Sequence, residues 1–573
     1  MQRAVDKRGD PVEILWIAAA VVFASVATGC AAVLASLFGA LSPAVGVASL
    51  VAGSAAGVLV VRSVRGAGRG AGEPARGGGP WGALALVAFA AASIRQFGWI
   101  AYEQGGILFT LLPNNYGDLP LHWTYVQHLA RGAAFWPENP ILTHERLRYP
   151  FGVDLLSAVF VQLGAPLPTL LPIMGLAGAA LAAFALRAWG GGFAVAAFLF
   201  SGGLAGFQVL TGDLADHQNA VAWKNLFLAL FVPQRGFLLA LPAGLLLLWS
   251  WRRRLLRGEP ALAPWIEGIA WGVMPLVHLH TFTFLSVVYA AWALGSRRVR
   301  PALPTLAWAF LPATWAVWQV TDGFRAASLV GWRPGWMIGG EGPLAFFLLN
   351  FGLFVPVTLV ALWVAVRERR REDLFLLVPA LAVFAALFVV KLAPWEWDNT
   401  KVMLWCSVAV LPPVWDLALA RVRRWLRALL LVALFFSGAV CVLGASIGRG
   451  PWLQVLDLRE YEAVCSALRG LETTRVATAP TFNHPVALCG RPIVAGYPGH
   501  LWSHGLDSAA AEKGLARLLR GEPRWREEAR ALGASHLYWG HREAAAFPTS
   551  SRPWRGGGPP VAQGAWGALY KLD

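Results

Sequence analysis

Residues 14–38 read ILWIAAAVVFASVATGCAAVLASLF, and residues 43–61 follow with PAVGVASLVAGSAAGVLVV. Neither stretch contains a charged residue, and each approaches or exceeds the roughly 20 apolar residues that a helix needs to cross a bilayer. The first run is longer than the apolar core of a signal peptide, and a second run follows at once. We therefore interpret residues 14–38 as a first membrane helix and not as a leader.

The composition extends this interpretation to the whole chain. Of the 573 residues, 57% are hydrophobic and only 14% are charged, whereas a soluble globular protein carries about 25% charged residues. The net charge of +16 does not indicate a nucleic-acid-binding protein, because the basic residues form short clusters between apolar runs and not one solvated face. Nearly all of them are Arg, a bias that we interpret as a GC-rich bacterial coding sequence.

The apolar runs predict an α-helical polytopic membrane protein with about thirteen transmembrane helices. The predicted spans are 14–38, 43–61, 81–101, 168–188, 191–209, 236–251, 264–278, 281–295, 304–320, 343–366, 374–390, 402–419 and 428–447. The two short runs of 264–295 meet at His278, so a re-entrant hairpin is an alternative there. No internal repeat is evident, which weakly disfavours transporter folds built from paired repeats.

The connecting loops alternate in charge. Arg-rich loops occur at 62–79, 252–263, 296–303, 367–373 and 420–427, and the positive-inside rule makes these loops and the N-terminus cytoplasmic. The opposite loops, 102–150, 210–235, 321–342 and 391–401, contain most of the loop acids. Everything after about residue 450 is then outside.

Residues 450–573 differ in composition from the bundle of residues 1–449. Helix-like segments at 458–470, 508–519 and 523–531 alternate with β-rich runs at 475–479, 492–495, 536–539 and 568–571. This pattern predicts a small extracytoplasmic α/β domain. Cys465 and Cys489 both lie in it and can pair if it faces an oxidising compartment.

The first outside loop contains the most informative segment, in which Asp118 precedes a predicted amphipathic helix over 120–131, with His122 one turn on. An acid placed there lies where a membrane cavity would open to water. Helix capping is the alternative, because Asp is a favoured N-cap residue and Pro120 would sit just inside the helix. The apolar run 151–165 is too short to span and is expected to dip into the membrane.

The second outside loop places Asp213, Asp216 and His217 close together. Two carboxylates three residues apart, with an imidazole, can hold a hard divalent ion or orient a hydroxyl, although acidic loop residues are usually only solvated. Arg235 lies at the outer mouth of a span, where it can meet an anionic headgroup or simply extend to the interface.

The fourth outside loop has two Lys and two acids, namely Lys391, Glu396, Asp398 and Lys401. An ammonium group is a good partner for a phosphate. Trp395 and Trp397 are explained by an interfacial aromatic belt. His278 and His280 are ionisable at membrane depth and are functional candidates, with hydrogen-bonded structural histidines as the alternative.

The sequence lacks a phosphate-binding loop, a dinucleotide fingerprint, an HExxH motif and a CxxC pair. The cytoplasmic loops are too short to form a nucleotide-binding domain. Any activated group must therefore come from the membrane or from outside.

The helical bundle, Asp118 in the first large outside loop and the C-terminal domain together resemble the GT-C superfamily of integral membrane glycosyltransferases. That resemblance implies an inverting enzyme with a polyprenyl-phosphate-linked sugar donor and a glycan, lipid or protein acceptor. Asp118 matches the family's first-loop carboxylate, and Asp213 or Asp216 matches a second-loop acid. The lone Asp in place of an acidic pair, and the lack of a WWDYG-type motif, disfavour an oligosaccharyltransferase.

The resemblance also assigns roles. Asp118 would be the base for the acceptor hydroxyl, assisted by Asp213, Asp216 or His217. The donor phosphate would be held by Arg235, Lys391 and Lys401, and the remaining substrate-binding candidates are Glu396, Asp398, His122, His278 and His280. A divalent cation, Mg²⁺ or Mn²⁺, is left open as a cofactor, with Asp118, Asp216 and His217 as candidate ligands.

The expected location is the bacterial cytoplasmic membrane, with the N-terminus inside and the C-terminus periplasmic or extracellular. The partners are then the bilayer, the donor and the acceptor, and no nucleic acid. The competing hypothesis is a transporter or flippase of lipid-linked glycans, in which the same acids, His278 and His280 relay protons. A catalytically inactive scaffold for envelope assembly is a third.

Overall fold

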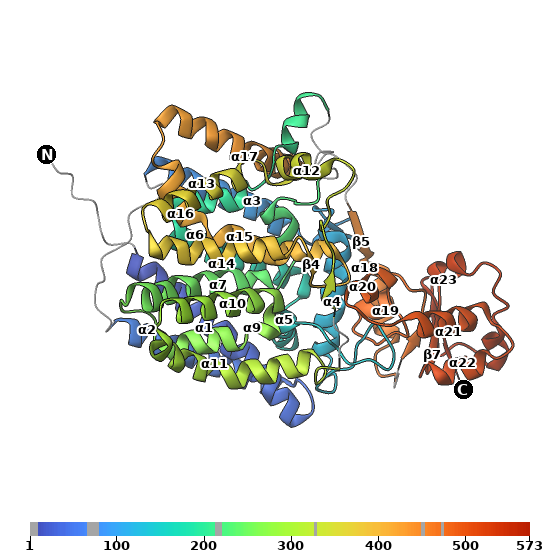
Figure 1. The fold of residues 1–573 in the computed structure, drawn as a ribbon. Helices are drawn as coiled ribbons and strands as arrows, with labels where there is room; N and C mark the ends of the chain where they lie inside the picture. Colours follow the sequence, from blue (N-terminus) through green and yellow to red (C-terminus); the bar gives the residue numbers. More distant parts are fainter. Residues whose placement is uncertain are drawn as a thin grey trace.

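A bundle of apolar helices makes up most of the protein, and a smaller region of helices and short strands projects from one end of it (Figure 1). The computed structural model describes residues 10–65, 79–212, 221–325, 329–447, 453–471 and 475–572. The bundle helices are α1 (Asp10–Phe38), α2 (Pro43–Arg65), α3 (Pro80–Gly98), α6 (Leu167–Leu199), α7 (Phe237–Trp251), α8 (Pro264–Gly272), α9 (Met274–Val277), α10 (Leu279–Gly295), α11 (Val299–Val320), α12 (Gly342–Phe351), α13 (Phe354–Arg367), α14 (Arg371–Ala386), α15 (Thr400–Ala409), α16 (Leu411–Pro413) and α17 (Arg424–Ile447).

The chain is a multi-pass membrane protein. Within its described residues, five helices are long and apolar enough to cross a membrane, or seven if each of two bent helix pairs counts as one span. The five are α1, α2, α3, α6 and α17, and one bent pair, α12 with α13, turns by 90°. The other predicted spans coincide with shorter or less apolar helices, such as α7 and α14. The number thirteen therefore stays a prediction.

Two breaks in the helices fall within or beside the predicted spans. The predicted spans 168–188 and 191–209 form the single element α6, which is non-helical at Gly190 and Gly191 and ends at Leu199. Gly191 has φ 67°, a conformation that a residue with a side chain rarely adopts. The chain also breaks at His278, between α9 and α10.

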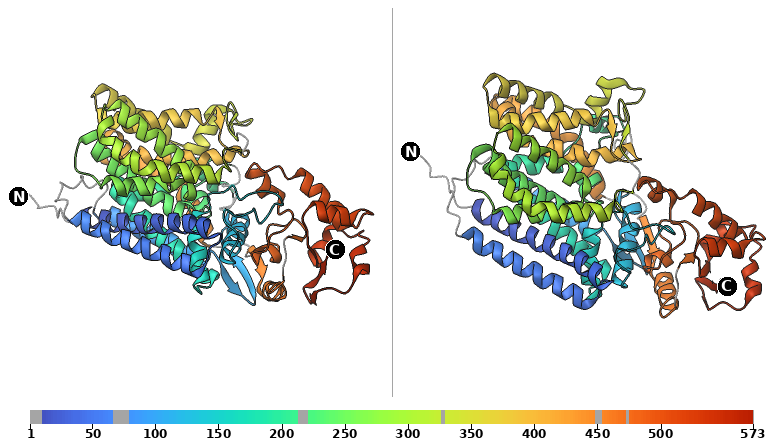
Figure 2. Two further views of the ribbon diagram at one scale, coloured as in Figure 1. Left: turned by 90° about the horizontal axis from the view of Figure 1, so that it is seen from below. Right: turned by 60° about the horizontal axis from the view of Figure 1, so that its bottom comes forward.

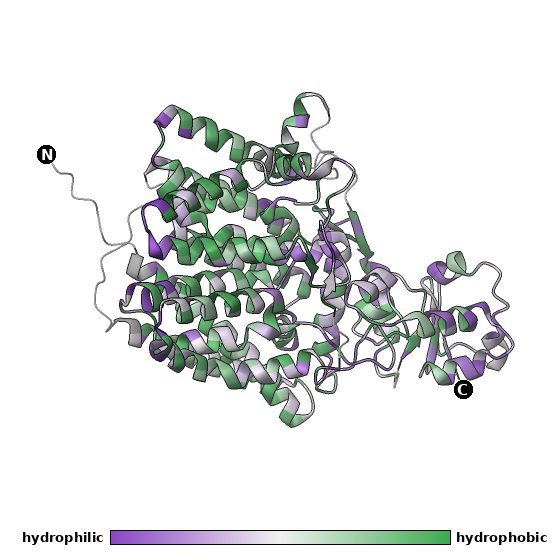
Figure 3. Ribbon diagram, viewed as in Figure 1, coloured by the Kyte–Doolittle hydropathy of each residue, from purple (hydrophilic) through white to green (hydrophobic). Residues whose placement is uncertain are grey.

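The loops group at two ends of the bundle. Arg252 and Arg257 both pair with Glu372, and Arg421 pairs with Glu368, so three Arg-rich segments meet at one end. Helix α7 leads away from the other end, where the four long loops meet. Figure 3 shows hydrophobic residues along the bundle and hydrophilic patches toward its ends. Which end faces the cytoplasm stays a prediction.

The helix that contains Asp118 is buried and is not a surface amphipathic helix. Helix α4 (Asn115–Ala130) begins five residues earlier than predicted, and most of its residues are buried, on all its faces. Its N-cap is Asn114, and Asp118 lies within the first turn, so the capping interpretation of Asp118 is wrong. Helix α5 (Gly152–Gln162) is short and buried along its first two turns, as expected for a segment that does not span.

The C-terminal region has the predicted mixed character. Its helices are α18 (Leu458–Ala467), α19 (Pro485–Leu488), α20 (Pro498–Ser503), α21 (Ala509–Arg520), α22 (Trp525–Ala531) and α23 (His541–Ala546). Its four-stranded sheet has the order β6 (Val476–Ala477), β7 (His536–Trp539), β9 (Gly567–Lys571) and β8 (Ala562–Gly564). Strands β6 and β7 are parallel and the other pairs antiparallel.

Backbone pairing joins this region to the first long loop. Strand β2 (Ile107–Thr110) lies between β1 (Tyr102–Gln104) and β5 (Leu453–Asp457), antiparallel to both. Residues 140–143 also exchange backbone hydrogen bonds with residues 493–496. The views in Figure 2 show the C-terminal region at the same end as the first loop. The prediction of a separate domain over 450–573 stays untested, and one strand of this region, β5, belongs to the same sheet as the strands of the first loop.

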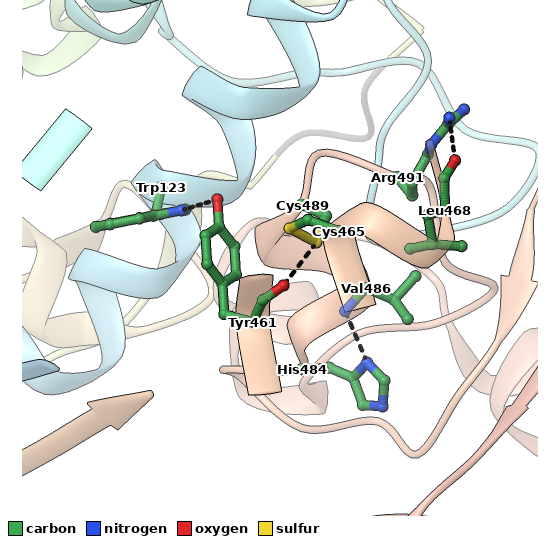
Figure 4. Close-up of a disulfide and its surroundings, with 8 residues drawn as sticks. All are labelled: Trp123, Tyr461, Cys465, Leu468, His484, Val486, Cys489 and Arg491. Atoms are coloured by element: carbon green, nitrogen blue, oxygen red, sulfur yellow. Dashed lines mark hydrogen bonds between the residues drawn. A yellow bond between two sulfur atoms is a disulfide. The ribbon is translucent and has the colours of Figure 1, made fainter. Parts of the chain in front are cut away.

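A close backbone approach fixes the C-terminal region on α4. Gly490 has φ 76°, and a Cβ there would lie 2.5 Å from the backbone of Gln127 in α4. Cys489, the preceding residue, forms a disulfide with Cys465 of α18, and Tyr461 of α18 accepts a hydrogen bond from Trp123 of α4 at 3.4 Å (Figure 4). Glycine is required at position 490, since it alone has both the conformation and the clearance.

We expect the disulfide to be present in the purified protein. Alkylation of denatured, unreduced protein should leave Cys465 and Cys489 unlabelled, and prior reduction should expose both. Closing a loop of 24 residues should contribute about 3 kcal/mol in the chain-entropy model, so the Cys465→Ser/Cys489→Ser variant should unfold at a lower temperature. Cys30 and Cys406 are free cysteines and serve as internal standards, because they should be labelled with and without reduction. Labelling of Cys465 and Cys489 without reduction would contradict the disulfide.

Candidate active site

A cavity of about 580 Å³ lies where the four long loops and the C-terminal region meet. Its wall is made by residues of the first loop, the 221–235 segment, α10, the 391–401 segment and α20, together with Thr321, Leu329 and Val330. The polar members are Asn114, Asp118, Arg148, Tyr149, Lys224, Gln234, His278, His280, Thr283, Thr321, Asp398, Lys401, His500, Ser503 and His504. Residues that are far apart in sequence thus line one cavity, which contains these polar side chains and lies at one end of the apolar bundle.

Asp118 lies in the cavity wall and projects from the first turn of α4. Gln234 donates a hydrogen bond from Nε2 to its Oδ2 at 3.3 Å. Burial raises the pKa of Asp118, while the nearby His122 and Lys401 lower it. A carboxylate with a raised pKa is a stronger proton acceptor than a solvated one, which suits a general base.

A buried carboxylate behind the cavity fixes the elements around Asp118. Asp154 of α5 is 1% exposed. It accepts a hydrogen bond from Nδ1 of His122 at 2.8 Å and another from Nε of Arg235 at 3.0 Å. Arg235 also donates to Oγ of Ser157 at 2.7 Å. This network holds α4, α5 and the turn before α7 together, and Gln234 in that turn reaches Asp118.

The close approach of that turn to the bundle depends on Gly236. A Cβ at this position would lie 2.5 Å from the backbone oxygen of Val277, directly before His278. The absence of a side chain therefore lets the Gln234–Arg235 turn pack on the break between α9 and α10. The Gln234–Arg235 turn and the break at His278 therefore lie at the same cavity.

Asp398 and Lys401 form an ion pair at 3.2 Å and also line the cavity. They lie on either side of the junction between a 3₁₀ turn (Glu396–Asn399) and α15. Asn399 anchors this junction, because it donates to the backbone oxygens of Leu387 and Val390 at 2.8 Å. An ammonium held beside a carboxylate at a cavity wall can receive a phosphate oxygen without a large rearrangement.

His278 and His280 reach the cavity from the break between α9 and α10. Nδ1 of His278 accepts hydrogen bonds from the backbone N–H and the hydroxyl of Thr281, and that hydroxyl accepts one from the indole of Trp405. This chain of donors assigns the ring hydrogen of neutral His278 to Nε2. His278 can therefore serve as a hydrogen-bond donor.

The C-terminal region contributes two further histidines, His500 in α20 and His504 directly after it. The ring of His504 packs on Tyr149 with centroids 4.8 Å apart. Burial lowers the pKa of His500 to about 4 and that of His504 to about 3. Both rings are therefore neutral at pH 7 and can exchange hydrogen bonds with hydroxyl groups.

Two more cations face the cavity. Lys224 has no ion pair with a carboxylate among the residues that the structure describes, and burial lowers the pKa of its ammonium group. Arg148 donates to Glu145 at 2.6 Å, while its buried Nε has no partner in the described part of the chain. An anionic ligand would give Lys224 a counter-charge and Nε of Arg148 a hydrogen-bond acceptor.

The other predicted site residues lie elsewhere. Arg235 and His122 are buried behind the cavity wall. Lys391 lies in β4 (Val390–Lys391), paired with β3 (Gly331–Trp332), and donates to the backbone oxygen of Pro394. Glu396 pairs with Arg333 at 3.1 Å. Asp213, Asp216 and His217 lie outside the described residues.

The described residues do not form a metal site. No group of three or more His, Cys, Asp or Glu side chains in that part of the chain has the geometry to hold a metal ion. Of the three metal candidates, Asp118 is bonded by an amide, and Asp216 and His217 lie outside the described residues.

Sequence reasoning missed several residues at or behind this cavity. Asp154 was signalled by a lone carboxylate within an apolar run, a pattern that marks a functional or paired group at membrane depth. His500 and His504 had no local signal, because only the fold of the C-terminal region brings α20 to the cavity. Tyr149 and Arg148 likewise depend on tertiary packing.

No protein-family model and no curated protein matches the chain. Among solved structures, it is similar to the Archaeoglobus fulgidus oligosaccharyltransferase tethered with an acceptor peptide, at 13% identity and a TM-score of 0.45, covering 82% of this chain and 71% of that one. The same enzyme in complex with zinc and sulfate gives 14% identity and a TM-score of 0.43, covering 80% and 68%. At these TM-scores the likeness carries no statement about the family or activity of this chain.

The histidines predict how stability depends on pH. His500 and His504 have folded pKa values near 4 and 3, below the ordinary value of about 6.5. The unfolded chain therefore binds protons first, so stability should fall as the pH falls from about 6.5 to 4. The His500→Asn/His504→Asn variant should show a smaller drop in apparent unfolding temperature over this range.

Differential scanning fluorimetry of the purified protein measures this dependence. His541→Asn, at an exposed position outside the cavity, is the matched control and should follow the wild type. Some slope should remain in the double variant, because burial also lowers the pKa of His128 to about 4. An equal drop in the wild type and the double variant contradicts the assignment.

Proposed function

We propose that this protein is a GT-C-type membrane glycosyltransferase that moves a sugar from a polyprenyl-phosphate carrier to an acceptor at the outer face of a bacterial cytoplasmic membrane. The observation that supports it most is the convergence in one cavity of Asp118 with Lys224, Arg148 and the Asp398–Lys401 pair. Glycosyl transfer from a lipid phosphate needs a base for the acceptor and cations for the departing phosphate.

The proposed reaction is a single displacement. The acceptor hydroxyl oxygen attacks the anomeric carbon of the donor sugar, and its proton passes to the carboxylate of Asp118. The bond between that carbon and the phosphate oxygen breaks, and the electron pair leaves with the polyprenyl phosphate. Lys401, Lys224 and Arg148 stabilise the phosphate, and attack opposite the leaving group inverts the anomeric centre.

The supporting residues have positioning roles in this scheme. Asp154 holds His122 and Arg235, and Gln234 orients the Asp118 carboxylate. Arg235 therefore acts through Gln234 and not on the phosphate directly. The neutral His278, His280, His500 and His504 would bind sugar or acceptor hydroxyls, and Asp213, Asp216 and His217 are further candidates in the second loop.

The orientation in the membrane is part of the proposal. The Arg-rich segments that meet at Glu372 and Glu368 would be cytoplasmic by the positive-inside rule. The cavity and the C-terminal region would then face the periplasm or the exterior, where the carrier presents its sugar. The acceptor would be a glycan, a lipid or a protein.

The alternative is a transporter or flippase for lipid-linked glycans, in which Asp118, His278 and His280 relay protons. The placement of these three ionisable side chains in one cavity is the observation that favours it. The two functions differ in whether a glycosidic bond is made, so a substitution at Asp118 separates them.

Asp118→Asn should abolish most of the transferase activity and leave the fold intact. Asn retains an oxygen for Gln234 but cannot accept a proton at neutral pH, so turnover should fall roughly 10²–10⁴-fold. The assay is transfer of labelled sugar from a panel of polyprenyl-phosphate sugars by the purified protein. Asp507→Asn, at an exposed carboxylate outside the cavity, should behave as wild type.

A folded Asp118→Asn protein with full transferase activity would eliminate this mechanism. A parent protein that never transfers sugar, but moves lipid-linked glycan across a vesicle membrane in a proton-dependent and Asp118-dependent manner, would establish the transporter.

Lys401→Ala should weaken donor binding, whereas Lys391→Ala should not. One charge-assisted contact to phosphate is worth about 1.5–3 kcal/mol, which corresponds to roughly ten- to a hundredfold in apparent donor KM. Lys391 is a matched control, because it lies in the same loop but outside the cavity. Initial rates at limiting donor measure the difference, and equal KM values in both variants place the phosphate elsewhere.

A further inference from the structure

Trp395 and Trp397 form a stacked pair in the cavity wall. Their ring centroids lie 5.2 Å apart with an interplanar angle of 25°, and both residues line the cavity. Trp397 is 9% exposed, whereas Trp395 is 42% exposed. The buried ring therefore backs the exposed one, which presents an aromatic surface beside Asp398 and Lys401.

The backbone that holds the pair is fixed on both sides. The indole of Trp336 donates to the backbone oxygen of Glu396 at 2.7 Å, and the Glu396 carboxylate pairs with Arg333. Asn399 accepts a hydrogen bond from the backbone of Leu392 at 3.0 Å. The rings are thus positioned before any ligand arrives, which reduces the entropy lost on binding.

An interfacial aromatic belt does not explain this arrangement. Belt residues place a ring among lipid headgroups at the bilayer surface, whereas Trp395 and Trp397 line the same cavity as the Asp398–Lys401 ion pair. In addition, Nε1 of Trp397 is buried and has no hydrogen-bond partner among the described residues.

We propose that the stacked pair Trp395–Trp397 is a saccharide-binding platform, with Trp395 under the sugar ring. A pyranose presents a face of C–H groups that packs on an indole, because the contact removes apolar surface from water. The hydroxyl groups around the ring edge can then bond to Asp398, Lys401 and the neutral His504. The assignment of this sugar to a transfer reaction rests on the proposed function.

The sugar has two possible sources, the lipid-linked donor and a glycan acceptor. Both present the same pyranose chemistry to Trp395, so the experiment includes separate probes for them. The donor sugar carries a lipid phosphate, and a glycoside without phosphate represents the acceptor.

The test is saturation-transfer NMR on the full-length protein in lipid nanodiscs, with methyl α-mannoside, methyl β-glucoside, methyl β-galactoside and methyl N-acetyl-β-glucosaminide as probes. We expect ring-proton signals from at least one glycoside, weakened about tenfold or more in Trp395→Ala and largely retained in Trp395→Phe, which keeps an aromatic face. Trp81→Ala, at a 78% exposed position in α3, is the matched control and should bind as wild type.

A second measurement identifies the source. Undecaprenyl phosphate, bare or bearing the sugar that binds best, is titrated into each variant. Weaker binding of only the sugar-bearing carrier to Trp395→Ala assigns the platform to the donor sugar. Unchanged binding of both carriers, with loss of the free glycoside, assigns it to the acceptor sugar.

Absence of glycoside binding to the wild-type protein, or equal binding to wild type and Trp395→Ala, overturns the platform. Failure of the proposed function gives a different result, because no sugar transfer that depends on Asp118 would then be measured, whatever Trp395→Ala does to glycoside binding. The two proposals therefore fail separately.

Discussion

The buried carboxylate of Asp154 is the interaction on which the arrangement of the cavity depends. An ionised side chain out of water is destabilising by several kcal/mol unless it is paired and hydrogen-bonded, and Asp154 has both His122 and Arg235 as partners. These partners come from α4 and from the turn before α7. The hydrogen bonds to the Asp154 carboxylate therefore hold α4, α5 and that turn in fixed positions. Asp118 lies one helical turn before His122, and Gln234 precedes Arg235. The network thereby sets the position of Asp118 without lining the cavity itself.

The C-terminal region completes the same chamber from outside the bundle. Its attachment rests on backbone pairing with residues 140–143, on the close approach of Gly490 to α4, and on the Cys465–Cys489 disulfide beside that contact. This attachment carries α20 to the cavity, where the residue before Asp118, Gly117, meets the His500 ring. A region that appears separable by composition is therefore part of the candidate site, and its disulfide lies close to the helix that contains Asp118.

The cations of the cavity differ in whether a carboxylate neutralises them, and this difference decides which ligand the cavity favours. The charge of Lys401 is neutralised by Asp398. Lys224 has no carboxylate partner among the described residues, and burial lowers the pKa of its ammonium group, which favours the uncharged form. Such a site favours an anion, because a bound phosphate restores the charge balance. Asp118 and the aromatic face of Trp395 lie in the same chamber, so an anionic group, a proton acceptor and a sugar ring would all find their complements there.

The sequence by itself determined the membrane character, the positions of most helices and the strands predicted at 536–539 and 568–571, because these depend on local hydropathy and period. It also identified Asp118, Asp398, Lys401, His278 and His280, since polar residues between apolar runs are conspicuous. The tertiary structure alone decided that these five share a cavity and that Lys391, Glu396 and Arg235 face other partners. It alone showed that α4 is buried, and it supplied His500 and His504. The physical reason is that side-chain neighbours set pairing and burial, and in this fold many of those neighbours are tens to hundreds of residues apart in sequence.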